Sequence, residues 1–126
     1  SGHGQYIIDI AASILNNKND RFMLIVPNNG SIPNLREDAV VEVPCYVNAN
    51  GVESISLDFK IPDFHKGLME AQVASEKLLV DAFFENSYQK ALEAFTLNQT
   101  VPNAQVAKQI LDDFIEANGD YWVELK

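Results

Sequence analysis

Residues 39–61, which read AVVEVPCYVNANGVESISLDFKI, decide the fold. The odd-numbered apolar residues from Val41 to Val47 lie on one face of an extended strand, because side chains two residues apart point the same way. Asn50-Gly51 accommodates the positive φ angles of a tight reversal, and apolar residues alternate again from Ile55 to Ile61. The stretch therefore predicts a β-hairpin with its second strand running to residue 61.

Two further elements are expected before the hairpin. Apolar residues recur at helical spacing from Gln5 to Asn16 and predict a helix with one continuous apolar stripe. The run from Phe22 to Val26 is uninterrupted and short enough for a buried strand. Within the hairpin, Pro44 has no N–H to donate, which predicts an edge strand or a bulge.

Three helices are expected after the hairpin. Asp63 can cap a long helix that runs to about Asn86 and keeps Leu79 and Phe83 among its inner residues. Ser87 can start a second helix, and Asn103 can cap a third. The order of helix, strands and three helices predicts an α+β fold in which helices pack with one antiparallel sheet. We expect residues 1–126 to form a single domain, since chains of this length commonly do.

Composition and charge limit the partners and the cellular compartment that can be expected for this chain. The 126 residues carry a formal net charge of -9, which disfavours nucleic acid and anionic membrane surfaces as partners. No apolar run approaches the roughly 20 residues of a membrane-spanning helix. Cys45 is the single cysteine, so an internal disulfide is excluded and a reducing compartment, the cytoplasm, is expected.

The residues alone do not form a complete active site. His3 and His65 have no carboxylate or thiol at a metal-ligand spacing. Asp112 and Asp113 are adjacent on a helix, so their side chains diverge and cannot share a proton. Cys45 lies mid-strand among valines, where a cysteine is usually a small core residue. We assign no catalytic residue and no metal ligand to this chain.

Several segments together resemble the C-terminal part of the family 4 glycoside hydrolases, which use NAD and a divalent metal. The segments are HGQYIID (3–9), LIVPNNGSIPNL (24–35), DAVVEVPC (38–45), KGLME (66–70), TVPNA (100–104), EAN (116–118) and YW (121–122). The block from Asn28 to Cys45 is the most specific, because its order and spacing recur as a unit. Within the family the segments look most like 6-phospho-α-glucosidases acting on maltose 6-phosphate, and 6-phospho-β-glucosidase is the alternative.

The resemblance implies a larger parent enzyme, an O-glycosyl hydrolase of carbohydrate metabolism. It implies an NAD-dependent oxidation and elimination, with manganese as the expected metal and a Rossmann domain upstream that holds the cofactors and the catalytic residues. The implied fold of this chain is that of the C-terminal domain of lactate and malate dehydrogenases. His3, Gly4 and Tyr6 would line the substrate side, where a helix N-terminus also favours phosphate. The alternative is that His3 is exposed and Tyr6 packs in the core.

Taken alone, the chain is expected to be inactive and to need no cofactor of its own. A different class of function is a non-catalytic binding or oligomerisation module that kept the fold. In either case, an apolar face that normally meets other protein predicts a homo-oligomer. The expected contacts are the outward sides of the helices at 5–16 and 63–86.

Overall fold

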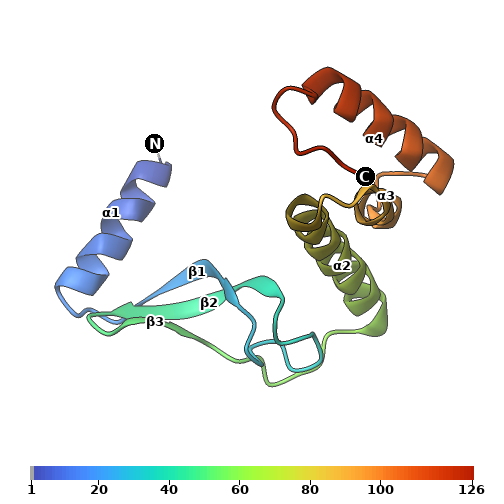
Figure 1. The fold of residues 1–126 in the computed structure, drawn as a ribbon. Helices are drawn as coiled ribbons and strands as arrows, with labels where there is room; N and C mark the ends of the chain where they lie inside the picture. The colour runs from blue at the N-terminus through green and yellow to red at the C-terminus, as the bar shows by residue number, and fades with distance from the viewer. Residues whose placement is uncertain (1) are drawn as a thin grey trace. The chain divides into compact units, whose positions relative to one another are not determined.

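The computed structural model describes residues 2–126, and its contacts divide the chain into two compact units, residues 1–61 and 62–126. Unit 1 contains helix α1 (Gly2–Leu15) and strands β1 (Asp20–Pro27), β2 (Val40–Asn48) and β3 (Gly51–Ser54). Unit 2 contains helices α2 (Asp63–Glu85), α3 (Tyr88–Leu97) and α4 (Ala104–Asn118). The predicted α+β class and the predicted order of elements are confirmed (Figure 1).

The three strands form one antiparallel sheet in the order β1-β2-β3. The hairpin is confirmed, but its reversal falls at residues 49 and 50, because Asn48 pairs with Gly51. Of the two residues expected to have positive φ, Gly51 has a φ of +111°, a conformation that residues with a Cβ adopt only with strain, and Asn50 does not have one. Val41, Val43, Cys45 and Val47 are all buried on the inner face of β2. Cys45 is therefore a core residue, as predicted.

Two expectations about the hairpin were wrong. β3 ends at Ser54 and does not reach Ile61, and β2 is the central strand of the sheet, not an edge. Pro44 explains where β3 ends. The amide of Ile55 still donates to the Pro44 carbonyl at 2.9 Å, but proline has no N–H to donate back, so the β2-β3 ladder cannot continue past this pair. Beyond it, the amide of Leu57 donates to the carbonyl of Ser31 instead.

The loop between β1 and β2 is organised by a fully buried side chain, that of Asn28. Its carboxamide oxygen accepts from the amide of Ile32 at 2.7 Å, and its nitrogen lies 3.1 Å from each of the Ile32, Leu35 and Arg36 carbonyls. One side chain thus replaces the backbone partners that the loop lacks. At the far end of the loop, Asn34 exchanges two hydrogen bonds with the backbone of Ile61.

Helix α1 contacts the sheet along one side only. The Ser13 hydroxyl is buried, donates to the carbonyl of Val47 at 2.7 Å and accepts from the amide of Asp20 at 3.1 Å. The predicted single apolar stripe was wrong in part, because Ile7 and Leu15 are 68% and 83% exposed. α1 therefore carries apolar residues that unit 1 does not cover.

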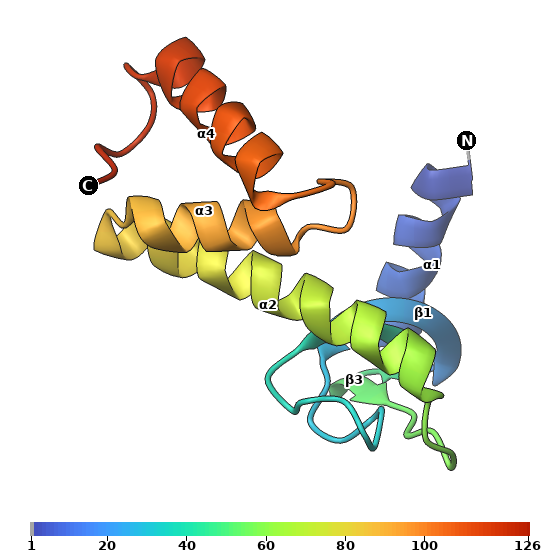
Figure 2. The ribbon, with the colours of Figure 1, turned by 90° about the vertical axis from the view of Figure 1, so that its right-hand side faces the viewer.

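In unit 2, α3 lies along the C-terminal half of α2, and α4 packs on α3 (Figure 2). Two predicted caps are confirmed: Ser87 accepts from the amide of Lys90, and Asn103 accepts from the amide of Val106. The third was wrong, because Pro62 occupies the N-cap of α2 and Asp63 is its first helical residue, without a capping hydrogen bond. Asp63 still favours the helix through its charge near the N-terminal dipole.

Small residues dominate the core of unit 2. Ala82, Ala91 and Leu111 are buried and in contact, and partly buried side chains from α3, α4 and the C-terminal tail pack around them. Leu79 and Phe83 were expected on the inner side of α2, but they are 49% and 56% exposed. Within the described residues, no helix is long and apolar enough to cross a membrane.

Candidate functional site

The predicted substrate-side residues lie at the start of α1, beside the first half of β1. A hollow of about 700 Å³ is lined there by Gly2, His3, Tyr6, Met23, Leu24, Ile25 and Glu42. His3 and Tyr6 both line this hollow. Gly4 is on the same helix turn but does not line this hollow, and a Cβ at Gly4 would meet nothing within 4 Å.

The sequence left open whether Tyr6 lines the substrate side or packs in the core, and its position is intermediate between the two. Its hydroxyl donates to the Met23 carbonyl, and its ring meets the ring of Phe22 edge-on, with centroids 5.6 Å apart. At 40% exposure it is neither a core side chain nor a free one. His3 is exposed, with its imidazole at the rim of the hollow. Both side chains remain accessible to a ligand in the hollow.

Glu42 is the residue of this site that sequence reasoning missed. It pairs with Ile25 in the β1-β2 register, and both residues lie on the outer face of the sheet, whereas Tyr6 meets Phe22 on the inner face. The alternating pattern marked Glu42 only as an outward residue, without a ligand role. Together the hollow offers an imidazole, a carboxylate and the N-terminal end of a helix, which is a set of groups suited to a polar ligand.

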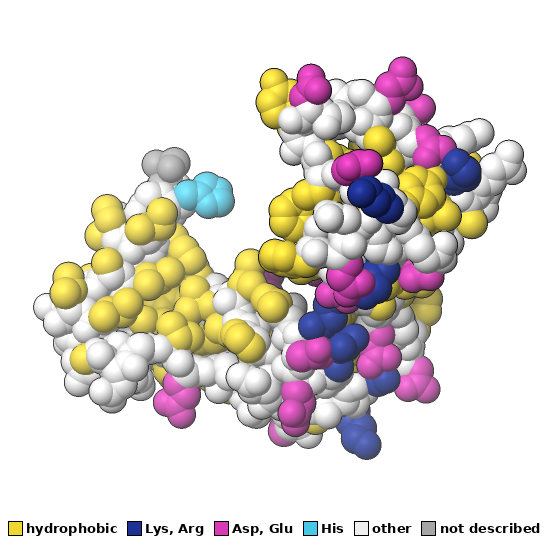
Figure 3. All heavy atoms as spheres, viewed as in Figure 1, with side chains coloured by type: hydrophobic (Ala, Val, Ile, Leu, Met, Phe, Trp, Pro, Cys, Tyr) yellow, Lys and Arg dark blue, Asp and Glu magenta, His cyan; other side chains and the backbone are white. Residues whose placement is uncertain are grey.

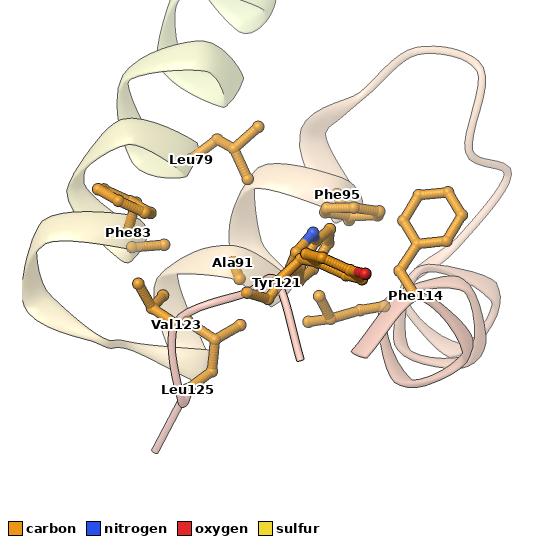
Figure 4. Close-up of a pocket in the computed structure, with 11 residues that line it drawn as sticks. Leu79, Phe83, Ala91, Phe95, Phe114, Tyr121, Val123 and Leu125 are labelled. Carbon is orange, nitrogen blue, oxygen red and sulfur yellow. The ribbon is translucent and has the colours of Figure 1, made fainter. Parts of the chain in front are cut away.

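Unit 2 contains a second concavity, which is of a different chemical kind. It has a volume of about 510 Å³ and lies between the helices and the C-terminal tail (Figure 4). Its walls are aliphatic and aromatic side chains, namely Leu79, Ala82, Phe83, Ala91, Phe95, Leu111, Phe114, Tyr121, Trp122, Val123 and Leu125. A pocket with a phenol as its only ionisable group has no acid-base pair for catalysis.

Cys45 and the Tyr88–Asp112 pair have structural roles. Burial raises the pKa of the Cys45 thiol, which keeps it protonated and unreactive. On the surface of unit 2, Asp112 accepts from the Tyr88 hydroxyl at 2.6 Å and from Lys108 at 2.5 Å. The hydrogen bond from Lys108 on the same helix, and then the one from Tyr88, lowers the pKa of Asp112, while the bond to Asp112 raises the pKa of Tyr88. Asp113 takes no part in these hydrogen bonds, so the two carboxylates do not act as a pair.

Metal-binding groups do not gather in residues 2–126, where no three His, Cys, Asp or Glu side chains could hold an ion. A parallel strand followed by a glycine-rich turn, which dinucleotide sites need, is also missing from the described sheet. The residues described here thus do not fit either NAD or a divalent metal.

Comparison with known proteins supports the family resemblance seen in the sequence. Residues 1–101 match the family described as the family 4 glycosyl hydrolase C-terminal domain. The chain is 56% identical to the maltose-6'-phosphate glucosidase MalH of Clostridium acetobutylicum over 98% of its own length, but it spans only 28% of that protein.

Solved structures agree with the sequence match. The chain superimposes on a 6-phospho-α-glucosidase from gut microorganisms, solved with NAD and Mn²⁺, with a TM-score of 0.94 and 49% identity over 100% of this chain and 28% of that one. The 6-phospho-β-glucosidase of Thermotoga maritima, solved with NAD and glucose-6-phosphate, gives a TM-score of 0.76 and 31% identity over 90% of this chain and 28% of that one. The chain belongs to glycosyl hydrolase family 4, whose C-terminal domain it matches.

Proposed function

We propose that this chain is the C-terminal part of a cytoplasmic 6-phospho-α-glucosidase that hydrolyses phosphorylated disaccharides of the maltose 6-phosphate type. The observation that carries the proposal is the higher similarity to the α-specific relatives than to the β-specific one, in both sequence and structure. The similarity extends through both units and is not confined to one motif.

The proposal places the cofactors outside this chain. An α-specific relative was solved with NAD and Mn²⁺, yet residues 2–126 lack a donor set for either. NAD and the metal would therefore be bound by a Rossmann domain in the other part of the parent enzyme, against which this chain would close as the C-terminal domain of lactate dehydrogenase does. The isolated chain would then show no hydrolase activity.

Within the parent enzyme, we assign the hollow beside α1 to the substrate side. The N-terminal end of α1 carries no acidic residue in its first turn, so its dipole and the His3 imidazole favour an anionic phosphate. Gly4 leaves the helix surface open at this end, since it has no side chain. Tyr6 presents a ring face for a sugar, and the Glu42 carboxylate is an acceptor for sugar hydroxyls.

A chimera tests the proposal directly. This chain would replace the matching C-terminal 28% of MalH, and the product would be assayed with chromogenic 6-phospho-α- and 6-phospho-β-glucosides in the presence of NAD and manganese. We expect α-specific turnover within about tenfold of MalH, which corresponds to an activation barrier higher by about 1.4 kcal/mol or less. A matched chimera built on the T. maritima β-enzyme should be much less active, because its part of the interface is more divergent.

The outcomes separate the competing functions. Activity only in the β-enzyme chimera would favour a 6-phospho-β-glucosidase. Soluble, folded but inactive chimeras on both hosts would favour a non-catalytic binding or oligomerisation module. The isolated chain, assayed under the same conditions, should not exceed a heat-inactivated control, and clear turnover would show that the catalytic groups have been misassigned.

A further inference from the structure

Three asparagine residues of this chain are followed directly by glycine, at Asn29-Gly30, Asn50-Gly51 and Asn118-Gly119. This dipeptide is chemically labile, because glycine has no Cβ to hinder attack of its backbone nitrogen on the carboxamide carbon of the asparagine. The product is a five-membered succinimide ring. The ring closes only when the glycine nitrogen lies on the same side as the asparagine Cβ, so the local backbone decides which pair reacts.

The folded chain holds two of these pairs away from ring closure. Asn29 has a φ of +43°, in the left-handed region, where a ψ of about +47° turns the next nitrogen nearly opposite the Cβ. Its amide also donates to the Glu37 carbonyl at 3.0 Å. Asn118 is the last residue of α4, and its carboxamide donates to the Phe114 carbonyl at 2.9 Å. Both pairs must leave hydrogen-bonded conformations before they can react.

Asn50-Gly51 lacks these restraints. Asn50 is exposed at the reversal of the β2-β3 hairpin, and its φ is not positive. Its carboxamide has no hydrogen-bond partner within residues 2–126. Backbone at the end of a small sheet opens more readily than at the centre, which gives access to the closing geometry. In Figure 3 this end of unit 1, at the lower left, is drawn mostly in the white of uncharged polar side chains and backbone, so water reaches it.

We propose that Asn50 is a site of spontaneous deamidation. The Gly51 nitrogen bonds to the Asn50 Cγ, the bond from Cγ to the carboxamide nitrogen breaks, and that nitrogen leaves as ammonia with the proton of the Gly51 amide. Water then opens the succinimide at one of its two carbonyls. Opening at Cγ gives aspartate, and opening at the backbone carbonyl gives isoaspartate, in which the main chain runs through the side chain. The proposal rests on unit 1 alone and does not depend on the glycosidase assignment.

Isoaspartate would change how the hairpin reversal contacts the turn between α1 and β1. The amide of Ala49 donates to the side-chain oxygen of Asn17 at 3.1 Å. The added backbone atom lies between this contact and Gly51, whose φ of +111° shapes the reversal. We therefore expect the Ala49 amide to exchange faster in the isoaspartate form. Asn50→Asp adds the negative charge without the extra backbone atom and should leave this exchange unchanged.

Peptide mapping of the full chain, incubated at neutral and mildly alkaline pH, tests the proposal. Trypsin separates the three pairs into peptides 22–36, 37–60 and 109–126. In the folded chain, peptide 37–60 should deamidate at least about tenfold faster than the other two, because it needs the least local opening. Isoaspartate should exceed aspartate in the product, and the rate should rise with pH. In guanidinium chloride, where the backbone restraints are lost, the three rates should converge.

Asn50→Gln is the matched control, because glutamine would have to close a less favourable six-membered ring. It should abolish the modification of peptide 37–60 and leave the other two peptides unchanged. Deamidation of Asn29 or Asn118 as fast as that of Asn50 in the folded chain would overturn the proposal. An Asn50 rate that folding slows as strongly as the Asn29 rate would overturn it as well. Isoaspartate that forms without faster exchange at Ala49 would overturn the proposed effect on the hairpin.

Discussion

Replacing Asn28 by Ala should destabilise the loop between β1 and β2 more than any surface substitution. The side chain is fully buried, and its carboxamide contacts one backbone N–H and three backbone carbonyls between Ile32 and Arg36. The carboxamide nitrogen has two N–H groups for three carbonyls, and the oxygen accepts one further hydrogen bond. Asn28→Ala therefore removes about three hydrogen bonds. At roughly 1 kcal/mol for each bond, with a penalty for buried groups left unpaired, we expect about 3 kcal/mol.

Amide hydrogen exchange measures this loss locally. The amides of Asn28, Asn29 and Ile32 are hydrogen-bonded in the loop, and they should exchange about 100-fold faster in Asn28→Ala, since 1.4 kcal/mol corresponds to a factor of ten. Asn118→Ala is the matched control, because it removes one exposed bond to the Phe114 carbonyl. Asn28→Asp should be as damaging at neutral pH, because a carboxylate would face three carbonyls. A change below about 1 kcal/mol in Asn28→Ala would refute the argument.

Three further outcomes are expected. Leu111→Ala removes the largest buried side chain of unit 2 and should cost about 2 to 5 kcal/mol in urea unfolding followed by Trp122 fluorescence, whereas less than about 1 kcal/mol would contradict its core position. Asp112→Asn should destabilise the chain at pH 7 but not under acidic conditions. The folded-state pKa of Asp112 is lowered, so its contribution is present above the unfolded pKa and is lost as pH falls through the folded pKa; a pH-independent difference between the variants would be evidence against this pairing. Ser13→Ala removes both buried hydroxyl bonds between α1 and the sheet and should cost about 1 to 3 kcal/mol, measured as faster exchange at the Asp20 amide; unchanged exchange would mean that α1 is held by other contacts.

Local sequence patterns correctly predicted the features that depend only on residues close together in the sequence. Ser87 and Asn103 were predicted as caps because a cap needs only its own side chain and an amide three residues on. The inward face of β2 followed from alternation alone. The cap of α2 was placed one residue too late, at Asp63, since a proline has no side-chain oxygen that would mark Pro62 as the N-cap.

Tertiary structure decided whatever depends on partners distant in sequence. The sequence shows that Pro44 cannot donate a backbone hydrogen bond. Only the pairing of β2 with both β1 and β3 shows that the missing hydrogen bond is on the β3 side of the strand. The residues of the candidate site were likewise identified partly from the sequence and partly from the structure. His3 and Tyr6 were identified through a family resemblance, whereas Glu42 is grouped with them only by the lining of the hollow in the folded chain. The apolar residues of α1 were recognisable from the sequence, but periodicity does not show which of them its own unit covers. The contacts of Tyr6 and Ser13 with the sheet show which side of α1 is covered.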